Sequence, residues 1–66
     1  MKGFIKTYDK EKGFGFIKVE NHGDVFFHFS RLVMEGYKSI EIGTEVEFEL
    51  VETEKGKQAH NIIRLT

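Results

Sequence analysis

The chain has 66 residues, of which 39% are hydrophobic and 14% aromatic, so it can form one small domain and is too hydrophobic for a disordered segment. It has no cysteine, which excludes disulfides and thiolate chemistry, and no apolar run approaches the roughly 20 residues of a membrane-spanning helix. The net charge of −1 at pH 7 argues against a polycation that simply coats nucleic acid. We therefore expect a single cytoplasmic domain over residues 1–66 that neither spans a membrane nor binds a cofactor.

The charged residues are unevenly distributed along the chain. Residues 1–40 hold seven basic and five acidic residues, a net charge of +2, whereas residues 41–66 hold three basic and six acidic residues, a net charge of −3. A basic part and an acidic part of one small domain predict one face that attracts an anionic partner.

Apolar residues alternate with polar ones along most of the chain, which is the pattern of half-buried strands. Five strands are predicted, over Lys2–Tyr8, Phe14–Glu20, Asp24–Phe29, Glu45–Glu52 and Lys57–Leu65. Glycines at the ends of residues 21–23 and 54–56 predict hairpin turns, because glycine accepts the positive φ that such turns need. In the longer crossing from Ser30 to Thr44, Ser30 is predicted to cap one helical turn over Arg31–Val33. Five short strands and one long crossing favour a small closed barrel, which leaves no sheet edge exposed.

The same alternation predicts which side chains face the core. Val46, Phe48 and Leu50 share one face of the fourth strand, and glutamates occupy the other face. In the third strand, Phe29 falls on the aliphatic side with Val25 and Phe27. Four aromatic side chains of the second and third strands instead share a face with charged residues, namely Phe14, Phe16, Phe26 and His28. If the aliphatic sides form the core, these four rings stand outside on adjacent strands.

Exposed rings on a sheet forfeit burial energy, so their position needs an explanation. Two structural explanations are open: the long crossing covers the rings, or they simply pair across strands. A functional explanation competes with both, because Lys6, Lys12 and Lys18 lie close to the rings in sequence. Flat aromatic faces with interleaved cations are a platform on which unpaired bases stack while the cations hold phosphates.

Two motifs favour the functional explanation. The segment Lys12-Gly13-Phe14-Gly15-Phe16-Ile17 is close to the RNP1 consensus K/R-G-F/Y-G/A-F-V of RNA-binding domains. The segment Val25-Phe26-Phe27-His28-Phe29 resembles the partner motif RNP2. An RNA recognition motif domain would need two full helices and a longer chain, so that fold is excluded.

With these two motifs, the whole chain resembles the bacterial cold shock proteins of the cold shock domain family. The resemblance runs from Lys2-Gly3 to Asn61 and includes Asp24, Ser30 and the segment Glu35-Gly36-Tyr37-Lys38. It implies an all-β fold, a five-stranded antiparallel OB-type barrel. It also implies binding of single-stranded RNA and DNA, with pyrimidine-rich targets, and a role as an RNA chaperone or transcription antiterminator. We expect mostly a monomer, with a dimer as the open alternative.

The resemblance also assigns roles to individual positions. The residues expected to stack bases are Tyr8, Phe14, Phe16, Phe26, His28, Phe29 and Tyr37. The residues expected to make charged or polar contacts are Lys6, Lys12, Asp24, Lys38 and Gln58, to which the sequence itself adds Lys18, Arg31 and Lys57. The chain departs from the family pattern at Thr7, where the family usually has a stacking tryptophan. It departs again at Lys57, where a proline is common, and at Arg31 and His60, which replace small residues.

Other functions are less well supported by the sequence. Three histidines and eleven acidic residues have no accompanying nucleophile motif, and so small a domain has little room for a pocket that excludes water, so we expect no enzyme. The histidines lack metal-ligand spacing, and Gly13-Phe14-Gly15 lacks the third glycine of a dinucleotide-binding loop. An OB-type module that binds protein or oligosaccharide is the alternative that stays open, because fold does not determine function.

Overall fold

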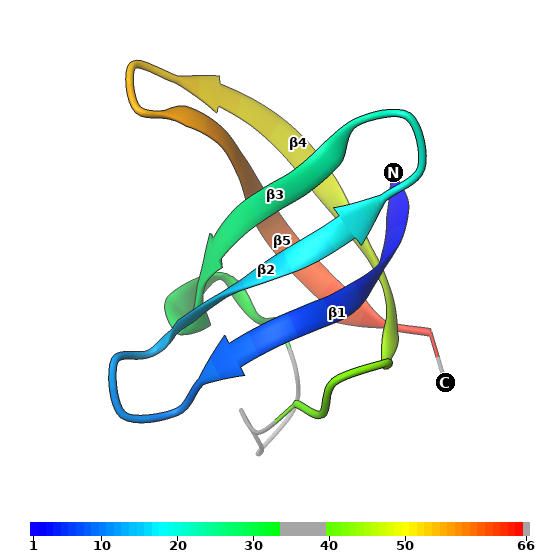
Figure 1. Cartoon of the computed structure of the whole chain (residues 1–66), viewed down its shortest axis with the longest axis vertical. Helices are drawn as coiled ribbons and strands as arrows, with labels where there is room; N and C mark the ends of the chain where they lie inside the picture. Colours follow the sequence, from blue (N-terminus) through cyan, green and yellow to red (C-terminus); the bar gives the residue numbers. More distant parts are fainter. Residues whose placement is uncertain (34–39, 66) are drawn as a thin grey trace.

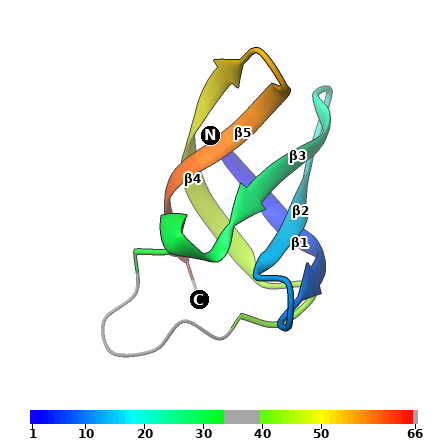
Figure 2. The same ribbon diagram turned by 90° about the vertical axis from the view of Figure 1, so that its left-hand side faces the viewer.

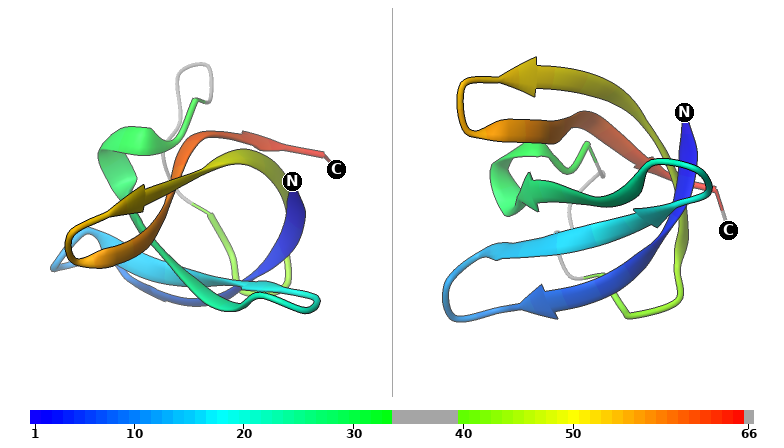
Figure 3. Two further views of the ribbon diagram at one scale, coloured as in Figure 1. Left: turned by 90° about the horizontal axis from the view of Figure 1, so that it is seen from above. Right: turned by 45° about the horizontal axis from the view of Figure 1, so that its top comes forward.

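The structure, a computed structural model, describes residues 1–33 and 40–65. Five strands form a closed barrel in the order β1-β2-β3-β5-β4, as Figures 1 and 2 show. The strands are β1 (Lys2–Asp9), β2 (Phe14–Val19), β3 (Gly23–His28), β4 (Glu45–Thr53) and β5 (Gly56–Arg64). Neighbouring strands are antiparallel except for β3 and β5, which run parallel (Figure 2). The view from above in Figure 3 shows how the strands curve around the barrel. The predicted all-β barrel is confirmed, and no predicted strand end is wrong by more than one residue.

The barrel interior is filled by the aliphatic faces that the alternation predicted. The largest side chains with almost no exposed surface are Phe27, Ile5, Ile17, Ile62, Val25 and Val46. In β4, Val46 and Phe48 are buried, and Leu50 is partly buried against them. The described residues contain no helix long and apolar enough to cross a membrane.

A register shift in β1 decides which of its residues face outward. Ile5 pairs with Ile17, but the next paired residue is Thr7, which lies opposite Phe16, so Lys6 forms a bulge. The extra residue places Thr7 on the outer surface beside Phe16 and brings Tyr8 opposite Gly15. A Cβ atom on Gly15 would collide with the carbonyl oxygen of Thr7 and with the ring of Phe27, so only glycine permits this close approach.

The predicted hairpin turns are present and hold the outward faces of β2 and β3 in register. Between β2 and β3, Asn21 and Gly23 have φ angles of 68° and 72°, and between β4 and β5 Gly56 has a φ angle of 116°. Glycine adopts these left-handed conformations without steric cost, and asparagine tolerates them. The first turn aligns Phe16 with Phe26 and Phe14 with His28 across the two strands.

The predicted helical turn is present two residues earlier than expected. A 3-10 turn, η1, spans Phe29–Arg31, and its N-cap is His28 rather than Ser30. The imidazole Nδ1 of His28 accepts a hydrogen bond from the backbone N–H of Ser30 over 3.2 Å, which satisfies a donor that the short turn leaves unpaired. Because β3 ends at His28, Phe29 leaves the strand alternation, and the prediction that it faces the core is wrong: Phe29 is 38% exposed.

Candidate nucleic-acid interface

The outer surface of β1, β2 and β3 carries two cross-strand rows of side chains. One row contains Thr7, Phe16, Phe26 and Gln58, which are directly paired from β1 through β2 and β3 to β5. The other row contains Asp9, Phe14 and His28. We call Phe14, Phe16, Phe26 and His28, which lie side by side in these rows, the aromatic platform.

The three phenylalanine rings of the platform are in contact through Phe26, and the platform stays partly open to solvent. The ring centroids of Phe14 and Phe26 are 5.7 Å apart with planes at 33°, and those of Phe16 and Phe26 are 5.9 Å apart at 75°. The three phenylalanines are partly exposed and His28 is exposed. Cross-strand pairing, one of the structural explanations left open by the sequence, is therefore observed, but it does not remove the rings from solvent.

His28 is held in a defined orientation at one end of the platform. Its Nδ1 atom accepts from the backbone N–H of Ser30 and lies 2.9 Å from the hydroxyl oxygen of the same residue. An Nδ1 atom that accepts the backbone N–H bond carries no proton, so in the neutral ring the proton is on Nε2. The imidazole lies 4.7 Å from the ring of Phe29, with planes at 42°, so η1 extends the aromatic surface by one residue.

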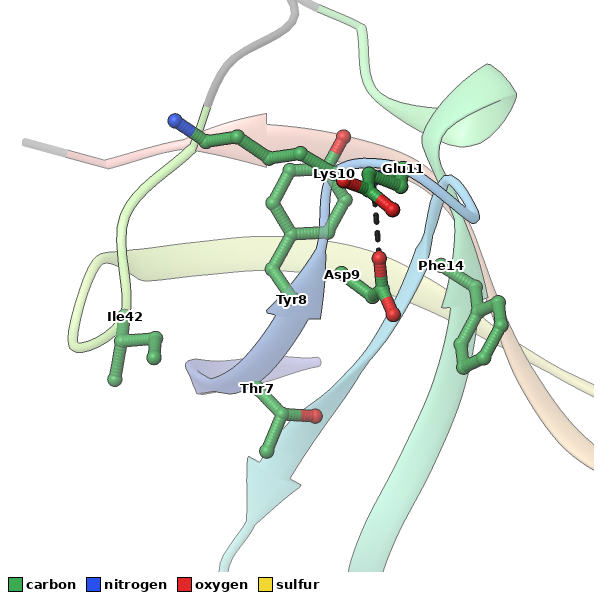
Figure 4. A pocket seen from close by; sticks show the side chains of 7 residues that line it. All are labelled: Thr7, Tyr8, Asp9, Lys10, Glu11, Phe14 and Ile42. Carbon is green, nitrogen blue, oxygen red and sulfur yellow. Dashed lines mark hydrogen bonds between the residues drawn. The ribbon is translucent and has the colours of Figure 1, made fainter.

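Tyr8 lies apart from the platform. Its ring stacks on the core residue Phe27, with centroids 5.7 Å apart and planes at 24°, and the side chain is partly buried. The bulge at Lys6 explains this position, since it places Tyr8 opposite the inward-facing Gly15. A surface pocket of about 570 Å³ opens beside Tyr8 and the exposed Thr7 and includes Phe14 and Ile42 (Figure 4). Sequence reasoning did not single out Ile42, which is 69% exposed.

Two of the predicted polar residues bind each other. The Nζ atom of Lys6 lies 2.8 Å from a carboxylate oxygen of Asp24, and both side chains are about half exposed. Because β2 lies between β1 and β3, this ion pair crosses the outer surface of β2. Asp24 is also the direct cross-strand partner of Lys18, whose side chain is exposed.

The loop between β1 and β2 brings Lys12 close to the platform. The Asp9 carboxylate accepts hydrogen bonds from the backbone N–H groups of Glu11 and Lys12, at 3.0 and 3.1 Å. Gly13 follows with a φ angle of 76°, and a Cβ atom there would collide with the ring of Phe29. The Lys12 side chain is exposed.

A smaller pocket of about 280 Å³ lies at the other end of the platform. It is lined by Phe16, Phe26, Lys55, Lys57 and Gln58, so β5 and the turn before it contribute two cations and an amide. Lys57 and Gln58 were predicted from the sequence, but Lys55 was missed. It lies in the turn before β5, two residues before Lys57, and strand alternation does not show that this turn reaches Phe26.

The remaining predicted residues lie elsewhere or outside the described parts of the chain. Arg31 is exposed on η1. Tyr37 and Lys38 fall within residues 34–39, outside the described residues, and these residues are also part of the crossing that was considered as a cover for the rings. In residues 1–33 and 40–65, no group of three histidine, aspartate or glutamate side chains is arranged to hold a metal ion.

Comparison with known proteins agrees with this geometry. A sequence profile described as the 'Cold-shock' DNA-binding domain matches residues 1–65. The chain belongs to the cold-shock DNA-binding domain family, as the resemblance in its motifs predicted.

Relatives and a solved structure place the chain more closely within the family. Cold shock protein CspA of Staphylococcus saprophyticus is 55% identical over 64 residues, which cover 97% of each chain. Cold shock protein CspA of Staphylococcus aureus is 53% identical with the same coverage. Among solved structures, drosophila Unr CSD456 superposes with a TM-score of 0.82 at 35% identity, over 98% of this chain and 26% of the other. The chain therefore spans about a quarter of that structure's chain.

Proposed function

We propose that this protein binds single-stranded RNA and DNA by stacking unpaired bases on the aromatic platform. The single observation that supports this most is the contiguous group of Phe14, Phe16 and Phe26, whose rings touch each other on an outer sheet surface and stay partly exposed. A base stacked on an aromatic side chain gains roughly 1–3 kcal/mol, and every base offers a flat face to such a ring. Membership of a DNA-binding family supports the same function.

The charges around the barrel support binding on this face. Lys12, Lys18, Lys55 and Lys57 lie around the platform with exposed side chains, and Arg31 is exposed on η1. On β4, which pairs with the other side of β1, the outward residues are Glu45, Glu47 and Glu49, which repel phosphate. The nucleic acid is thereby directed to the surface of β1, β2 and β3 and to the adjoining end of β5. By resemblance, Tyr37 adds a stacking ring, and Lys38, Gln58 and Asp24 make charged or polar contacts.

The cellular role follows from resemblance to the family. We propose that the protein acts in the cytoplasm as an RNA chaperone or transcription antiterminator on pyrimidine-rich single strands, mostly as a monomer and without a catalytic step. Its relatives named cold shock protein CspA support membership of the family on which this proposal rests.

Titration of labelled oligonucleotides tests the proposal directly. Single-stranded pyrimidine and purine oligomers and a duplex of the same sequence are compared at one salt concentration, with a fluorescent label because the chain has no tryptophan. We expect both single strands to bind, the pyrimidine oligomer more tightly, and the duplex to bind weakly. If no single strand binds, the proposal is wrong, and an OB-type module for protein or oligosaccharide becomes the better explanation.

A further inference from the structure

Phe4 is the most exposed of the seven phenylalanines, although it lies within a regular strand. Its side chain is 53% exposed, whereas its neighbours Gly3 and Ile5 are buried in the barrel. A phenyl ring left half in water forfeits much of its burial energy, so the barrel does not explain this residue. The family resemblance assigns it no role.

The register of the sheet places Phe4 diagonally across from Phe16 of the aromatic platform. Phe4 pairs directly with Lys18, and Phe16 is two residues before Lys18 on the same outward face of β2. Phe4 and Phe16 are therefore diagonal cross-strand neighbours, which lie about 7–8 Å apart and within reach of aromatic side chains. The Lys6–Asp24 ion pair crosses β2 at the border between the two rings.

The surface around Phe4 has the shape and charge for one more nucleotide. Phe4 lies in a surface pocket of about 470 Å³ that is lined by Lys2, Gly3, Phe4, Lys18, Glu20 and Glu45. Its direct neighbour on β2 is the exposed Lys18, and its direct neighbour on β4 is Glu45. Lys18 on β2 and Lys2 on β1 attract a phosphate, whereas Glu45 on β4 and Glu20 after the end of β2 repel it. The strand's backbone therefore follows Lys18, and its base lies toward β1.

We infer that Phe4 is an additional base-stacking position, with Lys18 holding the adjacent phosphate, and that it lengthens the aromatic platform by one nucleotide beyond the ion pair. This inference rests on the proposed single-strand binding and goes beyond it in naming a position and a path. A strand long enough to reach Phe4 gains one stacking contact, whereas a strand that fills the platform alone gains none.

The test compares Phe4→Ala, Phe4→Leu and Phe4→Tyr with the unsubstituted protein on oligothymidines of about four to about ten nucleotides. On the longer oligomers, Phe4→Ala and Phe4→Leu are expected to bind about fivefold more weakly, the lower limit for one stacked base. On the shortest oligomer they are expected to match the unsubstituted protein, and Phe4→Tyr is expected to match it at every length. Leucine keeps the apolar bulk without a flat ring, so it separates stacking from general hydrophobic contact.

Ile63→Ala is the matched control, because Ile63 is an apolar residue 40% exposed on β5 and pairs with Glu47, away from the platform. It should leave affinity unchanged at every length. The inference is overturned if Phe4→Ala has no effect on long oligomers, or the same effect at all lengths, while the unsubstituted protein binds. If the unsubstituted protein binds no single strand, the proposed function itself fails.

The surface around Phe4 has one rival use, as an interface between two copies of the chain. Sedimentation of the protein without nucleic acid distinguishes the two uses. The row Glu45–Phe4–Lys18 is self-complementary about a two-fold axis along β1, so two copies could stack their Phe4 rings and pair Lys18 with Glu45. A dimer that Phe4→Ala abolishes, together with unchanged oligonucleotide affinity, would overturn the nucleotide position in favour of an interface between copies. A monomer at all concentrations, with the length-dependent loss, supports it.

Discussion

Phe16 on β2 lies directly opposite Phe26 on β3, and their rings meet at 75° with centroids 5.9 Å apart. In such an edge-to-face pair, the ring that presents its edge keeps both of its faces uncovered by that contact. The pair therefore stabilises the hairpin and still leaves a flat aromatic surface for a ligand. This double use explains how three phenylalanines occupy an outer sheet surface of a domain with so small a core.

Removing single platform rings should weaken binding and leave the barrel folded. We expect Phe14→Ala, Phe16→Ala and Phe26→Ala each to cost roughly 1–3 kcal/mol of binding free energy, since each removes one stacking face. The comparison is Phe48→Ala, in which the lost ring is 3% exposed, and which should cost about 3–5 kcal/mol of unfolding free energy. Oligonucleotide titration measures the loss of affinity in all four variants, and urea unfolding measures their loss of stability. If the platform variants unfold as readily as Phe48→Ala, the rings are structural.

Affinity should depend only moderately on salt. We expect about three phosphates to be held by lysines, so log K should fall with log salt at a slope of about −2, from ~0.7 per phosphate of a single strand. Replacing Lys12 by Gln should flatten the slope by somewhat under one unit. Titrations at a series of salt concentrations give both values. A far steeper slope would mean that charge dominates and stacking is secondary.

Introducing an indole at position 7 should tighten binding. Thr7 is exposed beside a pocket of about 570 Å³ and pairs with Phe16, so a tryptophan there would add a flat face next to the platform. The expected gain for Thr7→Trp is about 1 kcal/mol, a roughly five- to tenfold tighter complex, because ordering a loosely held base offsets part of the stacking energy.

The measurement for Thr7→Trp is its affinity for one pyrimidine-rich strand at fixed salt, with the unfolding midpoint as control. The midpoint should change little, since the side chain faces solvent. Unchanged affinity would show that the strand does not pass position 7.

Gly15→Ala should destabilise the barrel strongly. The new Cβ atom would collide with the Thr7 carbonyl oxygen and lie 2.9 Å from the Phe27 ring, and neither the backbone nor the core can yield cheaply. We expect a loss of about 3 kcal/mol of unfolding free energy, the upper range for overpacking. Gly23→Ala is the control, because its Cβ would meet open space and only the φ of 72° is unfavourable, a cost of about 1 kcal/mol. If urea unfolding shows that Gly15→Ala and Gly23→Ala lose the same unfolding free energy, β1 can move away from β2 to make room for the new Cβ atom.

The fold was largely predictable because period-two alternation and glycine turns are local signals. Val46, Phe48 and Leu50 identified the core face of β4, and Asn21 and Gly23 identified the hairpin. The Lys6 bulge was not predictable, because one inserted residue leaves no mark in the alternation of a short strand. It moves Tyr8 onto the core ring Phe27 and away from the platform.

The candidate site was predictable where strand alternation continues and not where it ends. Phe14, Phe16 and Phe26 lie on regular strands, and the structure has them outward as expected. His28 lies at the end of β3, where its imidazole caps η1 in place of Ser30, a side-chain hydrogen bond that strand periodicity does not encode. Lys55 contributes to the site through the way the last hairpin folds over Phe26, which depends on tertiary structure.

The closure of the barrel has a consequence for its dynamics. In the described part of the chain, β3 and β5 pair in register at Phe26 and Gln58, supplemented by the bridge between Leu32 and Ile62. The other strand pairs are joined by longer ladders, so this seam is where local opening should cost least and amide hydrogens should exchange first. The pairing of β3 with β5 lies beneath the platform. A nucleic acid strand that contacts both Phe26 and Gln58 would therefore hold these two strands together from the outside. Ligand binding should therefore slow exchange at the seam more than in the hairpin of β1 and β2.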